Sequence, residues 1–226
     1  METEPPVVRL RPCSGTAGIK RPNVLSGEFL AEPALRERSR RAREALLDAA
    51  LLRFAANGYD ATTVVDIAHD AGIAVGGFYA HFRSKRQVLL ILVDRLLAEL
   101  ESLPVAAPGA GAATVIECIR QRFISDCRHA GVYRAWREAA SRDASLTEVQ
   151  ASIEAWASVK SAAALTAASA APGARAGVDI PTLSYVLSAM FLRVLESNVP
   201  DRAALADTIV TMVAHALFED GVIESG

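Results

Sequence analysis

The chain has 226 residues, of which 51% are hydrophobic and 22% charged, and its formal net charge is −2. It contains no run of about 20 apolar residues, which excludes a membrane-spanning helix of ordinary length. Its three cysteines, Cys13, Cys118 and Cys127, are too few and too scattered for a disulfide framework. We therefore expect a cytoplasmic protein without a secretion signal. Because alanine is abundant and strand-favouring runs are scarce, it should be mainly helical.

The charge is unevenly distributed along the chain. Residues 36–95 hold ten Lys and Arg against seven Asp and Glu, whereas residues 96–226 hold ten against fifteen. The overall balance argues against non-specific binding of nucleic acid, but the local excess of positive charge is compatible with a small DNA-binding module.

Residues 1–35 are rich in proline and glycine and show no hydrophobic period, so they are predicted to be a disordered or loosely attached extension. An arginine-rich stretch then leads into a helix that runs to about residue 56. Leu46, Ala50 and Phe54 give that helix one apolar face, and Asn57 followed by Gly58 ends it.

Two short helices are predicted next, at residues 62–72 and 74–81. Thr63 can cap the first of them, and Asp66 stands three residues later, where a carboxylate can complete a capping box. Gly72 permits a tight turn between the helices. Two short helices joined in this way form a helix-turn-helix, whose second helix enters the major groove of DNA.

The remainder of the chain reads as six further helices, which brings the total to about nine. Ser84 and Gln87 form another capping box at the start of a long helix that ends before Pro104. The later helices are predicted at about residues 112–129, 132–140, 144–170, 180–198 and 201–219.

The stretches AALLRFAANGYDATTV and DIAHDAGIAVGGFYAHF, followed by SK at the next helix start, closely resemble the N-terminal domain of TetR-family repressors. The dense resemblance covers residues 43 to about 95; beyond it, only the number, length and order of helices are similar. The resemblance implies an all-α protein with a three-helix DNA-binding domain at residues 36–84. A larger helical domain for ligand binding and dimerisation would follow at residues 85–226.

The resemblance also implies which residues touch DNA. Tyr79 and Lys85 occupy positions that grip phosphates in the family, contacts that fix register without reading sequence. Thr63, at a helix N-terminus, can offer N–H groups and a hydroxyl to another phosphate. His81 is a further candidate, although Tyr79 and His81 could instead support Phe78 and Phe82 as a partly buried aromatic pair.

The start of the second short helix departs from the family pattern. Ala74, Val75, Gly76 and Gly77 stand where relatives often place a polar cap and base-reading side chains, and none of them can make bidentate hydrogen bonds to a base. Ala74 and Val75 can touch a thymine methyl, and the glycines permit close approach of the backbone. Specificity should therefore depend on DNA shape and on the arginine arm at Arg40 and Arg41.

An enzyme is the main competing interpretation, and the sequence offers little for it. The chain lacks GxSxG, GxGxxG and GxxxxGK[ST] motifs. Cys118, Cys127 and His129 invite a metal or thiol site, but on one helix Cys118 and Cys127 face roughly opposite sides. Cys118 and His129 would lie about 16 Å apart along its axis. We expect buried structural cysteines, with no metal and no cofactor.

The last two predicted helices are apolar on more than one face, which indicates a dimer interface: one face for the domain itself and one for a second copy. The alternative is a monomer in which both helices are interior. The expected stripes are Leu183, Leu187, Met190 and Val194 on the first helix and Leu205, Ile209, Met212 and Ala216 on the second.

A ligand pocket is expected inside the C-terminal domain, where the family resemblance places it. Large aromatics and a flexible methionine suit an apolar or amphipathic effector that releases the dimer from a palindromic operator. Taken singly, each residue fits ordinary core better than a pocket wall, and the alternative for the whole chain is a DNA-binding scaffold without a ligand. The candidate walls are Phe123, Trp136, Trp156, Met190 and Phe191, with His129 and Arg193 as polar anchors.

Overall fold

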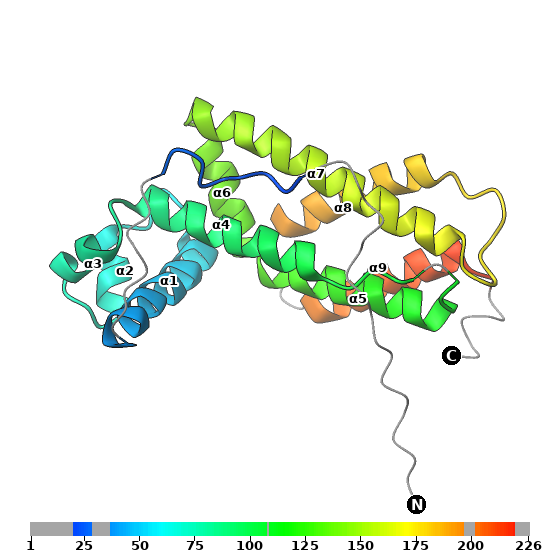
Figure 1. Ribbon diagram of the computed structural model, residues 1–226, viewed down its shortest axis with the longest axis horizontal. Coiled ribbons are helices and arrows are strands. Elements are labelled where there is room, and N and C mark those ends of the chain that lie inside the picture. The colour runs from blue at the N-terminus through cyan, green and yellow to red at the C-terminus, as the bar shows by residue number, and fades with distance from the viewer. Residues whose placement is uncertain (1–19, 29–36, 108, 197–201, 220–226) are drawn as a thin grey trace, which may run out of the picture.

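The computed structural model describes residues 20–28, 37–107, 109–196 and 202–219, which form nine α-helices (Figure 1). The predicted all-α fold is confirmed, and the described helix ends lie within about two residues of their predictions, except that α1 begins at Glu37 and includes the arginine-rich stretch that was expected to precede it. The helices are α1 (Glu37–Asn57), α2 (Val64–Asp70), α3 (Val75–His81), α4 (Lys85–Ser102), α5 (Ala112–Arg128), α6 (Ala130–Ala140), α7 (Ala144–Ser169), α8 (Ile180–Glu196) and α9 (Arg202–Leu217).

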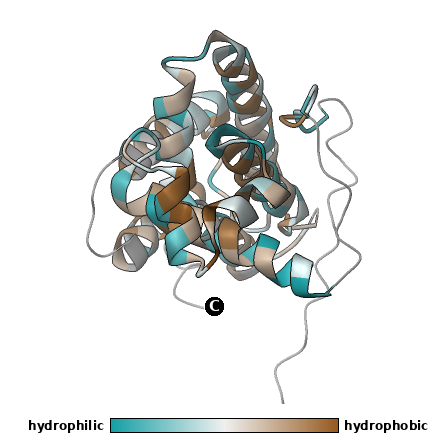
Figure 2. Cartoon of the chain, turned by 90° about the vertical axis from the view of Figure 1, so that its left-hand side faces the viewer, coloured by the Kyte–Doolittle hydropathy of each residue, from teal (hydrophilic) through white to brown (hydrophobic). Residues whose placement is uncertain are grey.

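Helix α4 connects the two ends of the molecule. Figure 1 shows α1, α2 and α3 grouped at one end of the long axis and α5, α8 and α9 toward the other, with α4 running between them. Figure 2 shows the molecule from the end that carries α1–α3. The apolar parts of the helices face the interior, and the hydrophilic parts lie at the periphery. In the part of the chain that the structure describes, no helix is both long and apolar enough to cross a membrane.

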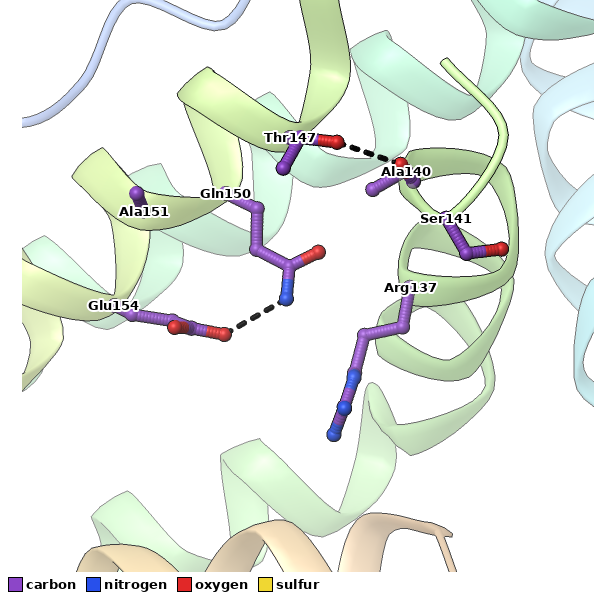
Figure 3. Close-up of a pocket in the computed structure, with 7 residues that line it drawn as sticks. All are labelled: Arg137, Ala140, Ser141, Thr147, Gln150, Ala151 and Glu154. Atoms are coloured by element: carbon purple, nitrogen blue, oxygen red, sulfur yellow. Dashed lines mark hydrogen bonds between the residues drawn. The ribbon is translucent and has the colours of Figure 1, made fainter. Parts of the chain in front are cut away.

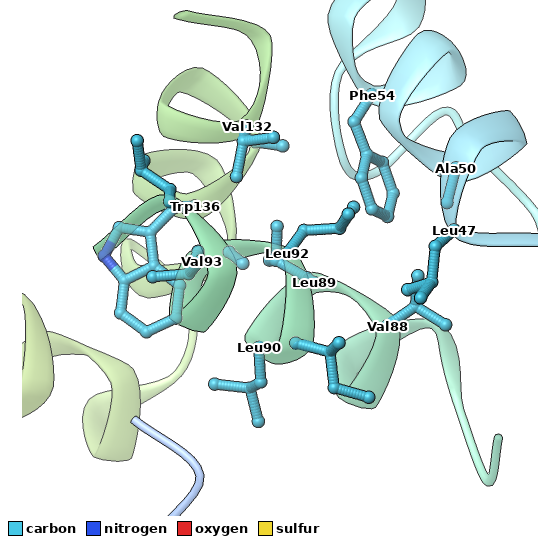
Figure 4. Packing of buried hydrophobic residues seen from close by; sticks show 14 of the residues in the cluster. Leu47, Ala50, Phe54, Val88, Leu89, Leu90, Leu92, Val93, Val132 and Trp136 are labelled. Atoms are coloured by element: carbon cyan, nitrogen blue, oxygen red, sulfur yellow. The ribbon is translucent and has the colours of Figure 1, made fainter. Parts of the chain in front are cut away.

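The first core cluster joins the N-terminal helices to α4, α6 and the first half of α7. Leu47, Ala50 and Phe54 of α1 pack against the apolar side of α4, and Val132 and Trp136 approach α4 from α6 (Figure 4). One apolar core therefore continues across the predicted domain boundary at residue 84, and that boundary stays a prediction. Phe78, Phe82, Ile153 and Trp156 belong to the same cluster.

The second core cluster holds the opposite end of the molecule together. It is built from α5, α9, the second half of α7 and Val194 of α8. Ile209, which belongs to one of the expected apolar stripes, is only 3% exposed and belongs to this cluster, so within one protomer it is packed in its own domain. The period of an apolar stripe shows that a face is buried but not by which protein, which is why the sequence could not separate the two cases.

Residues 20–28 differ from the expected disordered extension. Val24 is 4% exposed and belongs to the first core cluster, and Leu25 packs against that cluster. The segment turns at Asn23, whose carbonyl accepts from the Ser26 N–H at 3.3 Å, and Gly27 takes a φ of 80°. We call residues 20–28 the N-terminal strap. The rest of the predicted extension lies outside the described residues.

Candidate DNA-binding and ligand-binding sites

The capping box predicted at the start of α2 is present. Thr63 Oγ1 accepts from the Asp66 N–H at 3.1 Å, and the Asp66 carboxylate accepts from the Thr63 N–H at 3.0 Å. The hydroxyl of Thr63 also donates to Asp66 at 2.6 Å, and these hydrogen bonds lower the pKa of that carboxyl. Thr63 thus already has internal partners and an anionic neighbour, and its contact with a phosphate stays a prediction.

The turn between α2 and α3 follows from Gly72. Its φ of 65° lies in the left-handed region that favours glycine, and the Ile73 N–H then reaches back to the Ala68 carbonyl at 2.9 Å. Buried Ile67 and Phe78 hold the two helices together beneath the turn. This packing fixes the direction in which α3 points away from the domain.

The start of α3 presents little but backbone and small apolar groups. Ala74 caps the helix without a side-chain hydrogen bond, and Val75 is exposed. A methyl group added at Gly76 would meet open space, whereas one added at Gly77 would lie 2.6 Å from Cγ2 of Ile73. Gly77 is thus needed for packing within the domain, and Gly76 is the glycine that leaves room for an approaching molecule.

The two aromatic candidates on α3 have different surroundings. Tyr79 is 58% exposed and touches Phe78 edge-on, with ring centroids 5.4 Å apart. His81 is half-buried beside Phe82, and burial together with the nearby Arg43 lowers its pKa. Tyr79 therefore has the accessibility that a phosphate contact requires, while His81 matches the supporting role in an aromatic pair.

Lys85 has partners that the sequence did not indicate. Its Nζ donates to the carbonyls of Tyr59 at 2.6 Å and Thr62 at 2.7 Å, and it lies 4.2 Å from the centre of the Tyr59 ring. Partial burial lowers its pKa, against the opposing effect of Asp60. In this conformation Lys85 joins the loop after α1 to the start of α4, and a phosphate contact by Lys85 remains a prediction.

The arginine arm lies in the first turn of α1. Arg40 and Arg41 both pair with Glu37, and the Nε of Arg41 lies 2.9 Å from the carboxylate. All three side chains are exposed. Exposed ion pairs of this kind contribute little to stability, so DNA phosphates can compete for these guanidinium groups.

Helix α6 contacts the end of α1 through residues that were not among the sequence candidates. Arg134 donates to the Ala55 carbonyl at 2.7 Å, and Glu138 accepts from the Tyr59 N–H at 2.7 Å and the Asp60 N–H at 3.2 Å. A methyl group added at Gly131 would lie 2.5 Å from the Ala55 Cα. An isolated glycine within a helical pattern was the one available signal for this close approach.

The expected ligand-binding residues do not meet in one place. Trp136 and Trp156 belong to the first core cluster, whereas Phe123 and Met190 pack against the second. Arg193 is exposed on α8, and the side chain of Phe191 lies outside the described residues. The candidates are therefore divided between the two ends of the C-terminal domain.

His129 joins a polar cluster between α4 and α5. Its Nδ1 lies 2.9 Å from the Ser125 carbonyl and its Nε2 lies 3.5 Å from Glu99, which also accepts from the Ser125 hydroxyl at 2.7 Å. Cys118 and Cys127 are buried and free of disulfides. No group of three or more His, Cys, Asp or Glu in the described part of the chain is arranged to hold a metal.

The two buried tryptophans have an unusual polar feature. The indole nitrogens of Trp136 and Trp156 are buried, and neither has a hydrogen-bond partner in the structure. A buried donor without an acceptor costs about 1–3 kcal/mol. Within the first core cluster these N–H groups are therefore sites where an acceptor atom would be stabilising.

An open groove lies between the end of α6 and the start of α7 (Figure 3). It has a volume of about 430 Å³. Its lining is mixed: the polar side chains of Arg137, Gln150 and Glu154 stand around the hollow beside apolar groups. None of the candidate ligand residues lines it; the other lining residues are Ala140, Ser141, Thr147 and Ala151.

Comparison with known proteins supports the interpretation of the N-terminal helices. Residues 46–91 match the family model described as bacterial regulatory proteins, tetR family. The HTH-type transcriptional repressor KstR2 of Mycolicibacterium smegmatis is 51% identical over 47 residues. That alignment covers 21% of this chain and 23% of the repressor, so the chain matches less than a quarter of that relative's length.

Solved structures extend the likeness to the rest of the fold. The ketosteroid transcriptional regulator KstR2 of Mycobacterium tuberculosis has a TM-score of 0.56 at 21% identity, with 85% of this chain and all of that chain covered. SmeT, solved as a complex with triclosan, has a TM-score of 0.59 at 26% identity, with 80% and 93% covered. Residues 46–91 therefore form a helix-turn-helix region similar to that of the tetR family of bacterial regulatory proteins, and the all-helical architecture of the whole chain is similar to that of these two solved structures.

Proposed function

We propose that the protein binds a palindromic operator in double-stranded DNA as a homodimer and regulates transcription, most simply as a repressor. The observation that carries the proposal is the exposed surface of α3 within the matched domain. Tyr79 and Val75 are exposed on a helix that the buried Phe78 anchors in the core. The exposed arginines of the first turn of α1 supply positive charge from a neighbouring element.

Dimerisation through α8 and α9 is supported by apolar side chains that remain exposed in one protomer. Tyr185 is 76% exposed, Val186 51% and Met212 58%, although the helices that carry them bury their other sides. A second copy that covers these side chains would form a four-helix bundle about a two-fold axis.

A small-molecule effector is the third part of the proposal. The unpaired indole N–H groups of Trp136 and Trp156 favour an apolar molecule that carries a hydrogen-bond acceptor, since an acceptor would remove the cost of the buried donors. The structure of SmeT as a complex with triclosan supports a small ligand in this fold. Ligand binding would favour an orientation of the DNA-binding domains that no longer matches the operator.

DNA selection tests the main proposal. Duplexes recovered from a random pool by the full-length protein should converge on an inverted repeat with half-site centres about one helical turn apart, or slightly displaced from that. Recovery of unrelated sequences would contradict it.

A thermal-shift panel of small molecules tests the effector separately, because a ligand of the native state raises the melting temperature. Trp136→Phe and Trp156→Phe keep most of the apolar volume and remove the donors. A ligand whose shift is reduced in either variant is held by that indole. Regulation without any stabilising compound would favour a DNA-binding scaffold.

A further inference from the structure

The N-terminal strap (residues 20–28) lies along α4 on the side that faces α7 (Figure 1). Its central residue, Val24, is inserted into the first core cluster, while Ser26 and Gly27 of the same turn are exposed. The Glu28 N–H donates to the Leu25 carbonyl at 3.0 Å and closes the turn. The strap therefore has one defined apolar contact at its centre.

Charged side chains hold the strap at both ends. Arg21 donates to the Asp94 carboxylate at 2.6 Å and to the Asp94 carbonyl at 3.1 Å. Glu28 pairs with Arg86 in the first turn of α4. Asp94 and Arg86 are eight residues apart, about 12 Å along the helix axis. The strap is thus fixed to α4 at two points on either side of Val24.

Arg86 extends this attachment to α7. Its Nε donates to Asp143 at 3.1 Å and its Nη2 donates to Ser145 Oγ at 3.2 Å, and Asp143 is the N-cap of α7. Among the described helices, α4 packs closely on α1, α5 and α6, whereas α7 packs on α6 and α8. Arg86 and the strap therefore supply a direct connection between α4 and α7 where the two helices make little contact of their own.

The start of α4 is equally well attached to the DNA-binding domain. Lys85, next to Arg86, donates to the carbonyls of Tyr59 and Thr62. Further along α4, Arg95 makes two hydrogen bonds with Glu44 of α1, at 2.7 and 2.8 Å. Any shift of α4 relative to α7 would therefore be passed to the helix-turn-helix.

We propose that the N-terminal strap is an intramolecular latch that fixes α4 against α7 and thereby sets the orientation of the DNA-binding domain on the C-terminal domain. The proposal rests on the proposed function only for its effect on DNA. Release of Val24 removes this direct connection, so that the position of α4 relative to α7 varies more, and the separation of the two helix-turn-helix units in a dimer then varies more widely.

The test uses a matched pair of full-length variants. Val24→Asp places a carboxylate in the buried position. The strap can then detach from α4 and expose this carboxylate to water without unfolding the helices. Ser26→Asp adds the same charge to the same turn at an exposed position. Glu28→Gln removes the pairing with Arg86 while keeping the shape of the side chain.

The primary readout is the distribution of distances between spin labels on cysteines introduced at Ala80 of α3 and Ser158 of α7, both exposed. To restrict labelling to the two introduced cysteines, Cys13 is replaced by serine, while Cys118 and Cys127 are buried. Mixing with unlabelled protein keeps the measured distances within one protomer. Val24→Asp should broaden the distribution and Ser26→Asp should leave it as in wild type. Glu28→Gln should broaden it less, since the pair is partly exposed. An unchanged distribution in Val24→Asp overturns the latch.

The second readout is operator spacing. Insertion of one base pair between half-sites turns them by about 34° relative to each other. The preference of wild type for the selected spacing should fall by about threefold or more in Val24→Asp. Val115→Ala, at a buried valine of the second core cluster, controls for lost stability and should keep the preference.

The two readouts separate the two proposals. A wild-type protein that selects no DNA refutes the proposed function, while the label distances still decide for or against the latch. Normal operator binding with equal spacing preference in Val24→Asp and wild type refutes the latch alone.

Discussion

The two core clusters differ in how completely they bury their large side chains. In the first, Phe54, Phe78, Trp136 and Trp156 are all buried, and they connect α1 and α3 with α6 and α7. In the second, Phe218 is fully buried, but Phe123 and Met190 are only partly buried. The exposed Tyr185 and Met212 lie on α8 and α9, which pack against that cluster. The first cluster buries its large side chains within one protomer and supports the helix-turn-helix. The helices around the second cluster leave apolar side chains exposed, which a second copy would bury.

The largest expected effect is on the first cluster. Phe54→Ala should lower the free energy of unfolding by about 3–5 kcal/mol, because the side chain is fully buried between α1 and α4. Met190→Ala, at a partly buried position of the second cluster, should lower the free energy of unfolding by clearly less. Denaturant unfolding at one fixed protein concentration measures both. Equal losses would mean that the clusters do not differ as described.

The next effect concerns the exposed side of the second cluster. Met212→Glu should give a folded monomer, because the side chain is exposed in one protomer and like charges would meet across a two-fold axis. Val159→Glu on α7 is the matched control and should remain dimeric. Sedimentation and circular dichroism distinguish the outcomes. A dimeric Met212→Glu protein would place the interface on other helices.

A smaller loss is expected where α6 meets α1. Gly131→Ala should destabilise the protein by about 1–3 kcal/mol, because the new methyl group would collide with the backbone of Ala55. Gly76→Ala, where the added methyl group meets open space, should instead stabilise by about 0.5–1 kcal/mol. Thermal unfolding of the two variants measures both changes against wild type. Tolerance of both substitutions would mean that α6 can move away from α1 at no cost.

The smallest effect depends on pH. Two hydrogen bonds from Arg53 hold the pKa of the Asp70 carboxyl at about 2, against 3.8 when unfolded. The contribution of this pair is therefore fully present above pH 3.8 and is lost as pH falls through about 2. Asp70→Asn should melt slightly earlier than wild type at pH 7, and the difference should vanish near pH 2. A difference that persists at pH 2 would assign the effect to packing.

Short-range patterns accounted for most of the fold. The periods of apolar residues and the caps at Thr63 and Ser84 placed the helices, because both signals act within one or two turns. Ser84 accepts from the Gln87 N–H as expected, although the Gln87 side chain accepts from Arg83 instead of the cap. Helix existence and helix ends are local properties, and here the sequence was sufficient.

Long-range contacts could not be predicted in the same way. Val24 is a single buried residue in a segment without a period, so nothing local marks it as core. The carbonyl partners of Lys85 lie more than 20 residues away in the chain. Whether Ile209 faces its own domain or a partner depends on where α5 lies. Each of these features is decided by elements distant in sequence, so local patterns could not reveal the contacts of the candidate site.

The most direct test of the central claim is equilibrium binding to the selected operator and to a scrambled duplex of equal length, in wild type and in Tyr79→Phe. Wild type should bind the operator about 10³-fold or more tightly than the scrambled duplex. Because its hydroxyl is expected to touch a phosphate, Tyr79→Phe should weaken binding to both duplexes alike. Equal binding of wild type to both duplexes would contradict sequence-specific recognition by α3. A loss confined to the operator in Tyr79→Phe would make Tyr79 a reader of bases.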